Sequence, residues 1–205
     1  RLTIPAAPLP GMAGVIAERT TAINAALAKL TSTPSGNYMA APATSLNAAP
    51  LTEAALYVAP IYISRPCVLD RIGVEVPGGY AGGAGALVRL GIYSSDSSGL
   101  PSALLLDAGT IDGTQTGLLE LTISATIPSP GIYWLASVLQ GGATPAAGTR
   151  NNNGPIAAIP YTDGLTVTQT IASGYTDTSV TGALPNPIVI TGVVVTQPRV
   201  VVRIQ

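Results

Sequence analysis

Between about residue 53 and residue 205, short segments with alternating apolar and polar side chains follow one another. In residues 68–76 one face carries Val68, Ile72, Val74 and Val76, and the other carries Arg71 and Glu75. A period of two residues predicts a half-buried β-strand. Similar strand segments are predicted at residues 87–93, 103–111, 118–127, 131–139, 164–171, 187–196 and 199–205. With Gly-, Pro-, Asn- and Asp-rich turns between them, these segments predict an all-β fold over residues 51–205, an antiparallel, jelly-roll-like β-sandwich.

Residues 1–50 have a different pattern, and we expect them to form a separate attachment segment. The first eleven residues are Pro-rich and are expected to be extended. Residues 12–30 contain good helix formers and predict one short helix. Residues 31–50 contain Pro34, Gly36, Pro42 and Pro50, which predicts an irregular linker.

The apolar residues of the predicted helix recur with heptad spacing. Its seam consists of Ile16, Thr20, Ile23, Leu27 and Leu30. Two heptads are too short to hold a free coiled coil. Two interpretations therefore stay open: the helix packs on its own domain, or copies of the chain meet along this seam as a homo-oligomer.

The composition excludes several classes of function. Nine basic and ten acidic side chains nearly cancel, so we expect no nucleic-acid partner. The chain has no histidine and one cysteine, Cys67, which removes the commonest general base, zinc ligands and an internal disulfide framework. No stretch approaches the roughly 18 apolar residues that a spanning helix needs, so we expect no membrane insertion. We expect neither a cofactor nor a metal.

The carboxylates give no sign of an active site. Two carboxylates at a defined separation would suffice for a glycosidase, but Asp107, Asp112 and Glu120 are scattered over predicted turns and polar strand faces. The segment around Asp96 lacks the spaced carboxylates of a calcium loop. We therefore expect no catalytic residues, and a protein that is not an enzyme.

Aromatic and amide side chains in predicted loops are candidates for sugar binding. A flat aromatic ring can contact the C–H face of a sugar while amides and carboxylates bind its hydroxyls. The candidates are Tyr80, Arg150, Asn151, Asn152, Asn153, Tyr161, Asp163, Tyr175 and Asp177. Ordinary turn chemistry is the alternative for the asparagine run. Trp134 lies within a predicted central strand, where a role in the core is expected.

The order of several short motifs between Leu56 and Gln140 resembles a known family. The motifs are Leu90-Gly91-Ile92-Tyr93, Gly99-Leu100-Pro101, Leu106-Asp107-Ala108-Gly109-Thr110 and Gly131-Ile132-Tyr133-Trp134-Leu135-Ala136. In order and spacing they resemble the β-sandwich domain of fibre, tail-fibre and head-spike proteins of tailed bacteriophages and phage-derived gene transfer agents. The resemblance implies a virion surface appendage, usually trimeric, that meets the host cell surface, and it carries over no catalytic motif.

These observations together favour a non-enzymatic virion structural protein, made in the bacterial cytoplasm and exposed on the virion surface. We expect a homotrimer that attaches to other virion proteins through residues 1–50 and binds a host surface polysaccharide through its sandwich. Weak sites in several copies would gain strength through avidity. The alternative is a capsid or tail decoration or adaptor protein that binds no glycan. A cellular carbohydrate-binding module or adhesin is a third interpretation.

Overall fold

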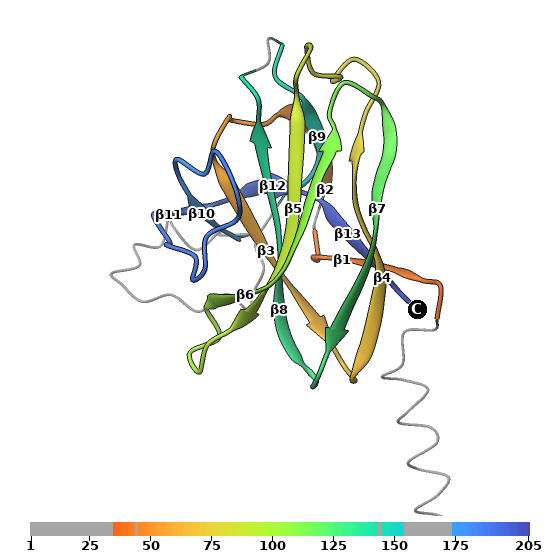
Figure 1. The fold of residues 1–205 in the computed structure, drawn as a ribbon, viewed down its shortest axis with the longest axis vertical. Coiled ribbons are helices and arrows are strands. Elements are labelled where there is room, and N and C mark those ends of the chain that lie inside the picture. Colours follow the sequence, from red (N-terminus) through yellow and green to blue (C-terminus); the bar gives the residue numbers. More distant parts are fainter. Residues whose placement is uncertain (1–34, 44, 143–144, 154–173) are drawn as a thin grey trace, which may run out of the picture. The chain divides into compact units, whose positions relative to one another are not determined.

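Thirteen strands account for the regular structure in a computed structural model, which describes residues 35–43, 45–142, 145–153 and 174–205 (Figure 1). They are β1 Tyr38–Ala40, β2 Ser45–Pro50, β3 Leu56–Ile63, β4 Cys67–Val76, β5 Leu87–Ser95, β6 Pro101–Asp112, β7 Gly117–Ile127, β8 Gly131–Gln140, β9 Gly148–Asn153, β10 Gly174–Asp177, β11 Gly192–Val194, β12 Thr196–Pro198 and β13 Val200–Ile204. They belong to a unit spanning residues 34–205. The predicted helix at residues 12–30, with its seam, lies outside the described residues.

The strands form three sheets, and the strands within each sheet pair antiparallel. One sheet has the order β1-β13-β4-β7, a second β11-β10-β3-β8-β5-β6, and a third β12-β9-β2. The four-stranded and six-stranded sheets pack face to face, because one apolar cluster takes side chains from both. Ile72 of β4 and Val202 of β13 meet Leu90 of β5 and Leu135 of β8 in that cluster. The prediction of an all-β antiparallel sandwich is thus confirmed at this level.

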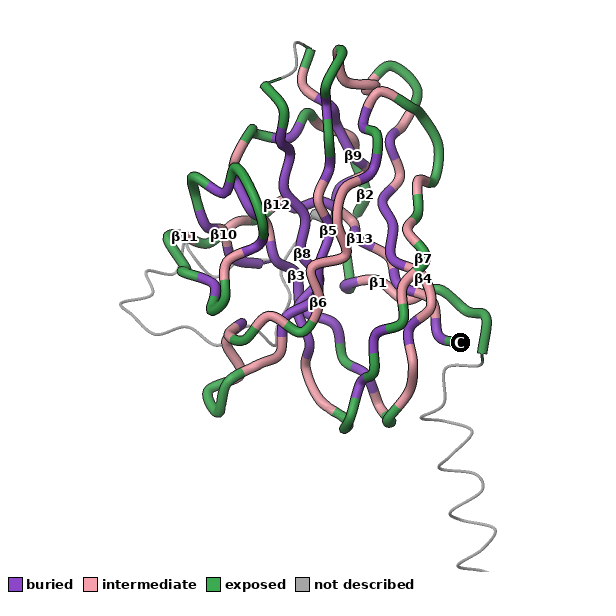
Figure 2. The backbone as a smooth tube through the Cα atoms, viewed as in Figure 1, coloured by how far each residue is buried: buried purple, intermediate pink, exposed green. Residues whose placement is uncertain are grey.

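The alternation in the sequence sets which face of each strand is buried. In β13, Val200, Val202 and Ile204 are buried, while Val201 and Arg203 are partly exposed. Figure 2 shows the buried positions concentrated along the strands and the exposed ones in the turns. The half-buried strands of the four-stranded sheet therefore present a polar outer face.

The central part of the six-stranded sheet, around β8, is buried on both faces. On its outer side, a second apolar cluster joins Trp134 and Val138 of β8 to Tyr175 of β10 and to Leu184 and Ile188. The last two belong to residues 178–190, which we call the covering segment. Double burial explains why β8 reads as a nearly continuous apolar run. Its predicted central place is correct, since it lies between β3 and β5.

A polar network holds the covering segment on the sheet. Asp107 accepts hydrogen bonds from Nη1 of Arg89 at 2.8 Å, with both oxygens, and from the Leu184 amide at 3.0 Å. Arg89 Nε donates to Gln140 Oε1 at 3.3 Å, and Gln140 Nε2 donates to the Gly182 carbonyl at 2.7 Å. The segment is therefore attached through its backbone as well as through its apolar side chains.

Residues 35–50 differ from the sequence prediction. The predicted irregular linker contains β1 and β2, and each pairs with a strand that is distant in sequence. Tyr38 of β1 lies opposite Arg203 of β13, and β2 pairs along its length with β9. Small residues and prolines did not prevent pairing, because both are short edge strands, where proline costs little.

Candidate functional site

The outer face of the four-stranded sheet carries a concentration of charged and aromatic side chains. Alternation in β4, β7 and β13 turns Glu75, Leu118, Glu120, Val201 and Arg203 away from the core. Their burial ranges from intermediate to exposed. In a chain with 9 % charged residues, this face brings together three charged side chains beside exposed apolar ones.

Tyr38 reaches across this face from the edge strand. Its hydroxyl donates to Oε1 of Glu120 at 2.6 Å, although β13 and β4 lie between their two strands. Gly73 of β4 makes this possible. A Cβ on Gly73 would lie 2.9 Å from Cγ of Glu120, so the missing side chain leaves room for Glu120 over the strand. The hydrogen bond from the hydroxyl to Glu120 raises the pKa of Tyr38 above its ordinary value, so the hydroxyl stays protonated.

Two bidentate ion pairs frame the same face. Arg203 donates from Nε and Nη2 to Asp70 at 2.9 and 2.7 Å, and Arg150 of β9 donates from Nε and Nη2 to Glu75 at 3.3 and 2.9 Å. The guanidinium carbon of Arg203 also lies 5.9 Å from the centroid of the Tyr38 ring. These contacts fix the orientation of the side chains on this face.

A hollow of about 350 Å³ opens on this face. It is lined by Tyr38, Glu75, Gly117, Leu118, Arg150, Arg199 and Val201. Tyr38 and Leu118 are large apolar side chains that stay 43 % and 50 % exposed. An exposed ring beside oriented guanidinium and carboxylate groups offers both an apolar surface and directional hydrogen-bond partners. We call this group of seven residues the sheet-face hollow.

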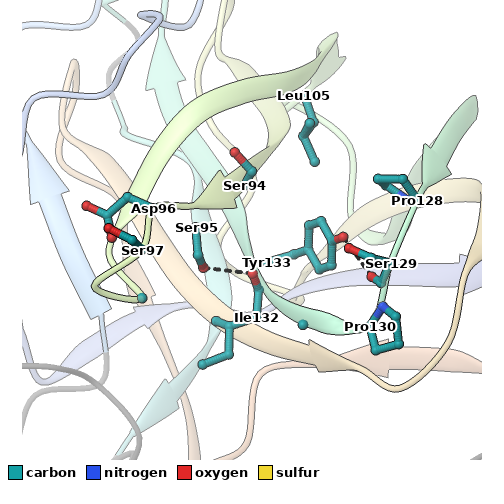
Figure 3. A pocket seen from close by; sticks show the side chains of 12 residues that line it. Ser94, Ser95, Asp96, Ser97, Leu105, Pro128, Ser129, Pro130, Ile132 and Tyr133 are labelled. Carbon is teal, nitrogen blue, oxygen red and sulfur yellow. Dashed lines mark hydrogen bonds between the residues drawn. The ribbon is translucent and has the colours of Figure 1, made fainter.

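A larger hollow of about 460 Å³ lies where β5 approaches the turn between β7 and β8 (Figure 3). Several of its polar side chains make hydrogen bonds to the backbone of the turns that line it. Ser95 Oγ donates to the Ile132 carbonyl at 2.7 Å and the Tyr133 hydroxyl donates to the Ser129 carbonyl at 2.8 Å. Oδ1 of Asp96 accepts from the amides of Ser98 and Leu100. Because its described lining includes no basic side chain, the sheet-face hollow is the better candidate.

The structure disperses most of the residues predicted to bind a glycan. Asn151, Asn152 and Asn153 were expected on an exposed loop, which is wrong: they form strand β9 between β2 and β12. The side chains of Asn151 and Asn152 are 4 % and 0 % exposed. Asn151 Oδ1 accepts from Thr149 Oγ1 at 2.7 Å, and Asn152 Nδ2 donates to the Ala41 carbonyl at 3.1 Å. The Asn151 amide thus pairs with the buried Thr149 hydroxyl, and the Asn152 amide pairs with the buried Ala41 carbonyl.

The predicted loop tyrosines also differ from expectation. Tyr175 lies in β10, is buried and packs on Trp134 with a ring-centroid distance of 5.3 Å, so its expected exposure is wrong. Asp177 is buried in the same strand. Tyr80 is half-buried against β9, where a Cβ on Gly148 would lie 2.5 Å from its Cδ1 atom. Tyr161 and Asp163 lie outside the described residues.

Arg150 is the predicted candidate that lines the sheet-face hollow. Sequence reasoning missed Tyr38 and Arg199 because Tyr38 lies in the predicted linker and Arg199 begins a predicted strand, whereas the glycan candidates were sought in loops. The signal available was the alternation in residues 199–203, which places Arg199, Val201 and Arg203 on one face.

The carboxylates considered for hydrolysis do not converge in the structure. Asp107 binds Arg89, Asp112 caps the turn at Thr114, and Glu120 accepts from Tyr38. Within the described ranges, no group of three or more Cys, Asp or Glu side chains is placed to hold a metal ion. Nor does that part of the chain contain a helix long and apolar enough to cross a membrane.

Neither the scan against protein-family models nor the search of curated proteins produced a match to this chain.

The two ion pairs at this face predict acid sensitivity. Hydrogen bonds from Arg203 and Arg150 lower the pKa of Asp70 and of Glu75 below their ordinary values of 3.8 and 4.5. Because the folded pKa values lie below the unfolded ones, the pairs stabilise the fold fully above the ordinary values. This stability is lost as the pH falls through the lowered ones.

We therefore expect the free energy of unfolding to be lower at about pH 3 than near neutrality, measured by urea unfolding. Asp70→Asn should lower it at neutral pH and flatten its pH dependence. Unchanged pH dependence in that variant would contradict the assignment to this pair.

Proposed function

We propose that this chain is a non-enzymatic structural protein of a phage or phage-like particle, a fibre or spike that binds a host surface polysaccharide. In this proposal the sandwich is jelly-roll-like, and the chain is a homotrimer that attaches to other virion proteins through the part of residues 1–50 that precedes β1. Passage of the chain between the two large sheets at β3–β4, β4–β5, β6–β7 and β7–β8 supports the jelly-roll-like class. The resemblance of the motifs between Leu56 and Gln140 supports the fibre or spike class.

The observation that carries the glycan part is the sheet-face hollow. Sugars present an apolar C–H face and a rim of hydroxyls, and proteins bind them with exposed rings flanked by planar polar groups. Tyr38 and Leu118 supply the apolar surface, and the paired Arg150 and Glu75 supply donors and acceptors already held in place. A shallow open site of this kind binds weakly in one copy, so several copies on a particle would act through avidity.

The test is binding of fluorescently labelled protein to capsulated candidate host cells, before and after removal of the capsule. Tyr38→Ala should weaken capsule-dependent binding about tenfold, because it removes the exposed ring from the hollow. The matched control is Tyr62→Ala, since Tyr62 is 64 % exposed on β3 and lies outside the hollow. Equal binding by wild type and Tyr38→Ala, with melting temperatures unchanged, would contradict the site.

A second candidate function is a decoration or adaptor protein that binds other particle components and no glycan. One observation favours it. The large apolar side chains Val189, Ile190, Val193 and Val195 are 37–60 % exposed, and residues 178–198 contain no charged residue. A cluster of exposed apolar side chains is typical of protein contact surfaces. Binding to particle proteins without binding to any capsulated cell would favour this second function.

A further inference from the structure

The sheet-face hollow contains more positive charge than its own ion pairs neutralise. Its lining carries two guanidinium groups, those of Arg150 and Arg199, and one carboxylate, that of Glu75. Among the lining side chains, two positive charges less one negative charge leave one positive charge, while the Glu120 carboxylate, which accepts from the Tyr38 hydroxyl, lies outside the lining. Glu75 is engaged by Arg150 at 2.9 Å, so Arg199 supplies the excess.

Arg199 has no side-chain partner within the described part of the chain. Its side chain takes part in none of the three ion pairs found there, nor in any side-chain hydrogen bond. Its position is nevertheless fixed by the backbone, because its amide donates to the Arg150 carbonyl at 2.8 Å. The charge of Arg199 also lowers the pKa of Glu75, though less than Arg150 does. Arg199 therefore interacts electrostatically with a carboxylate that lines the hollow.

The surroundings of Arg199 suit an anion attached to a ring. Its guanidinium is planar, and two of its N–H groups can bind the two oxygens of a carboxylate at once. Tyr38 and Leu118 offer an apolar surface in the same hollow. A small free anion would contact only the Arg199 guanidinium. A sugar acid would contact the guanidinium with its carboxylate and the apolar surface with its ring.

We propose that the sheet-face hollow binds an acidic sugar, a uronic or related sugar acid, with its carboxylate on Arg199 and its ring on Tyr38 and Leu118. The inference rests on the proposed glycan-binding function and narrows it to acidic polysaccharides. Arg150 keeps its pairing with Glu75 and offers the second positive charge beside the carboxylate. The chain's net charge of −1 gives no general attraction for such polymers, so binding depends on this local excess.

The experiment measures binding of the full chain to polygalacturonate, alginate and polysialic acid. It uses the same polymers after chemical reduction of their carboxyl groups, and the host capsule of the preceding test. Arg199→Gln should weaken binding to at least one acidic polymer by about tenfold or more, because a charge-assisted bidentate contact is lost. Arg199→Lys should recover part of the affinity, since it keeps the charge without the planar guanidinium.

Arg65→Gln is the matched control. It removes one positive charge from an exposed position between β3 and β4, outside the hollow. It should bind as the wild type does, and carboxyl reduction should abolish the difference between wild type and Arg199→Gln. Melting temperatures of all variants verify that each is folded.

Three results would overturn the inference. They are equal binding by Arg199→Gln and wild type, equal binding of native and reduced polymers, and no binding to any acidic polymer. If the capsule is still bound in a Tyr38-dependent manner in any of these cases, the proposed function stands and the acidic-sugar assignment alone fails. Loss of all polysaccharide binding, with the protein folded, would overturn both.

Discussion

Replacing Trp134 by alanine should lower the free energy of unfolding by about 3–5 kcal/mol, the range found when large aromatic side chains are removed from a core. Trp134 is 1 % exposed, and it packs on Tyr175 in the cluster under the covering segment. Its indole N–H donates to Ser95 Oγ at 3.0 Å. Since domains of this size have net stabilities of about 5–15 kcal/mol, this single change removes a large share of the total.

The measurement is urea unfolding followed by circular dichroism, because the variant has no tryptophan to report by fluorescence. Trp134→Phe serves as the control, since it keeps an aromatic ring and loses the indole hydrogen bond, and it should cost clearly less. Hydrogen exchange should rise in residues 180–188 of Trp134→Ala. If Trp134→Ala lowers the free energy of unfolding by less than about 1 kcal/mol, the covering segment does not bury this face of the sheet from solvent.

Replacing Asp107 by alanine should cost about 2–3 kcal/mol, because it leaves the guanidinium of Arg89 without its carboxylate in a site that is about one-fifth exposed. The Leu184 and Gly109 amides lose their acceptor at the same time. Burial alone would raise the pKa of Asp107, but the hydrogen bonds from the Leu184 amide and from Arg89 outweigh it and hold the pKa below its ordinary value. The ionised carboxylate is therefore the form that stabilises the fold, and protonation in acid should mimic the substitution in part.

The readout for Asp107→Ala combines urea unfolding with hydrogen exchange over the covering segment. Asp112→Ala is a suitable control, because among the described residues the Asp112 carboxylate accepts only from Thr114 and Gln115 in its own turn. It should leave exchange in residues 180–188 unchanged. Equal protection of that segment in Asp107→Ala and wild type would show that the apolar contacts hold the segment without the polar network.

The sequence pattern predicted the sandwich because two-residue alternation indicates a strand with one face on a core and the other face away from it. Val74 and Glu75, or Val202 and Arg203, must face opposite ways on a strand. The same reasoning placed Trp134 in the core, and the structure confirms that. Alternation does not indicate which strands pair with one another, however, so the order of strands in the sheets could not be predicted.

Residues 35–50 and the asparagine run were mispredicted for a shared reason. Ala48, Ala49 and Pro50 have weak strand propensity, as does a run of three asparagines, so each segment alone reads as a loop. They form strands because they pair with each other, Asn151 opposite Asn47 and Arg150 opposite Ala48. Pairing between strands that are distant in sequence outweighs the weak strand propensity of each segment. Such pairing produces no pattern within either segment from which it could be predicted.

The candidate site was less predictable than the fold. Tyr38, Glu75, Leu118 and Arg199 come from four separate segments. Only the placement of β13 between β1 and β4 brings them together. The search for sugar-binding side chains favoured loops rich in Tyr, Asn and Asp, whereas this hollow lies on the face of a sheet.

The central position of β13 has a consequence for the order of events during synthesis. Val200 and Val202 pair with Val74 and Ile72, and on the other side β13 is the partner of β1. A ribosome-bound chain that has not reached residue 199 already contains Tyr38, Glu75 and Arg150, yet it has no strand on which β1 can lie. Translation therefore completes the four-stranded sheet and its hollow after the hairpin of β5 and β6, and chains that lack β13 also lack the proposed binding surface.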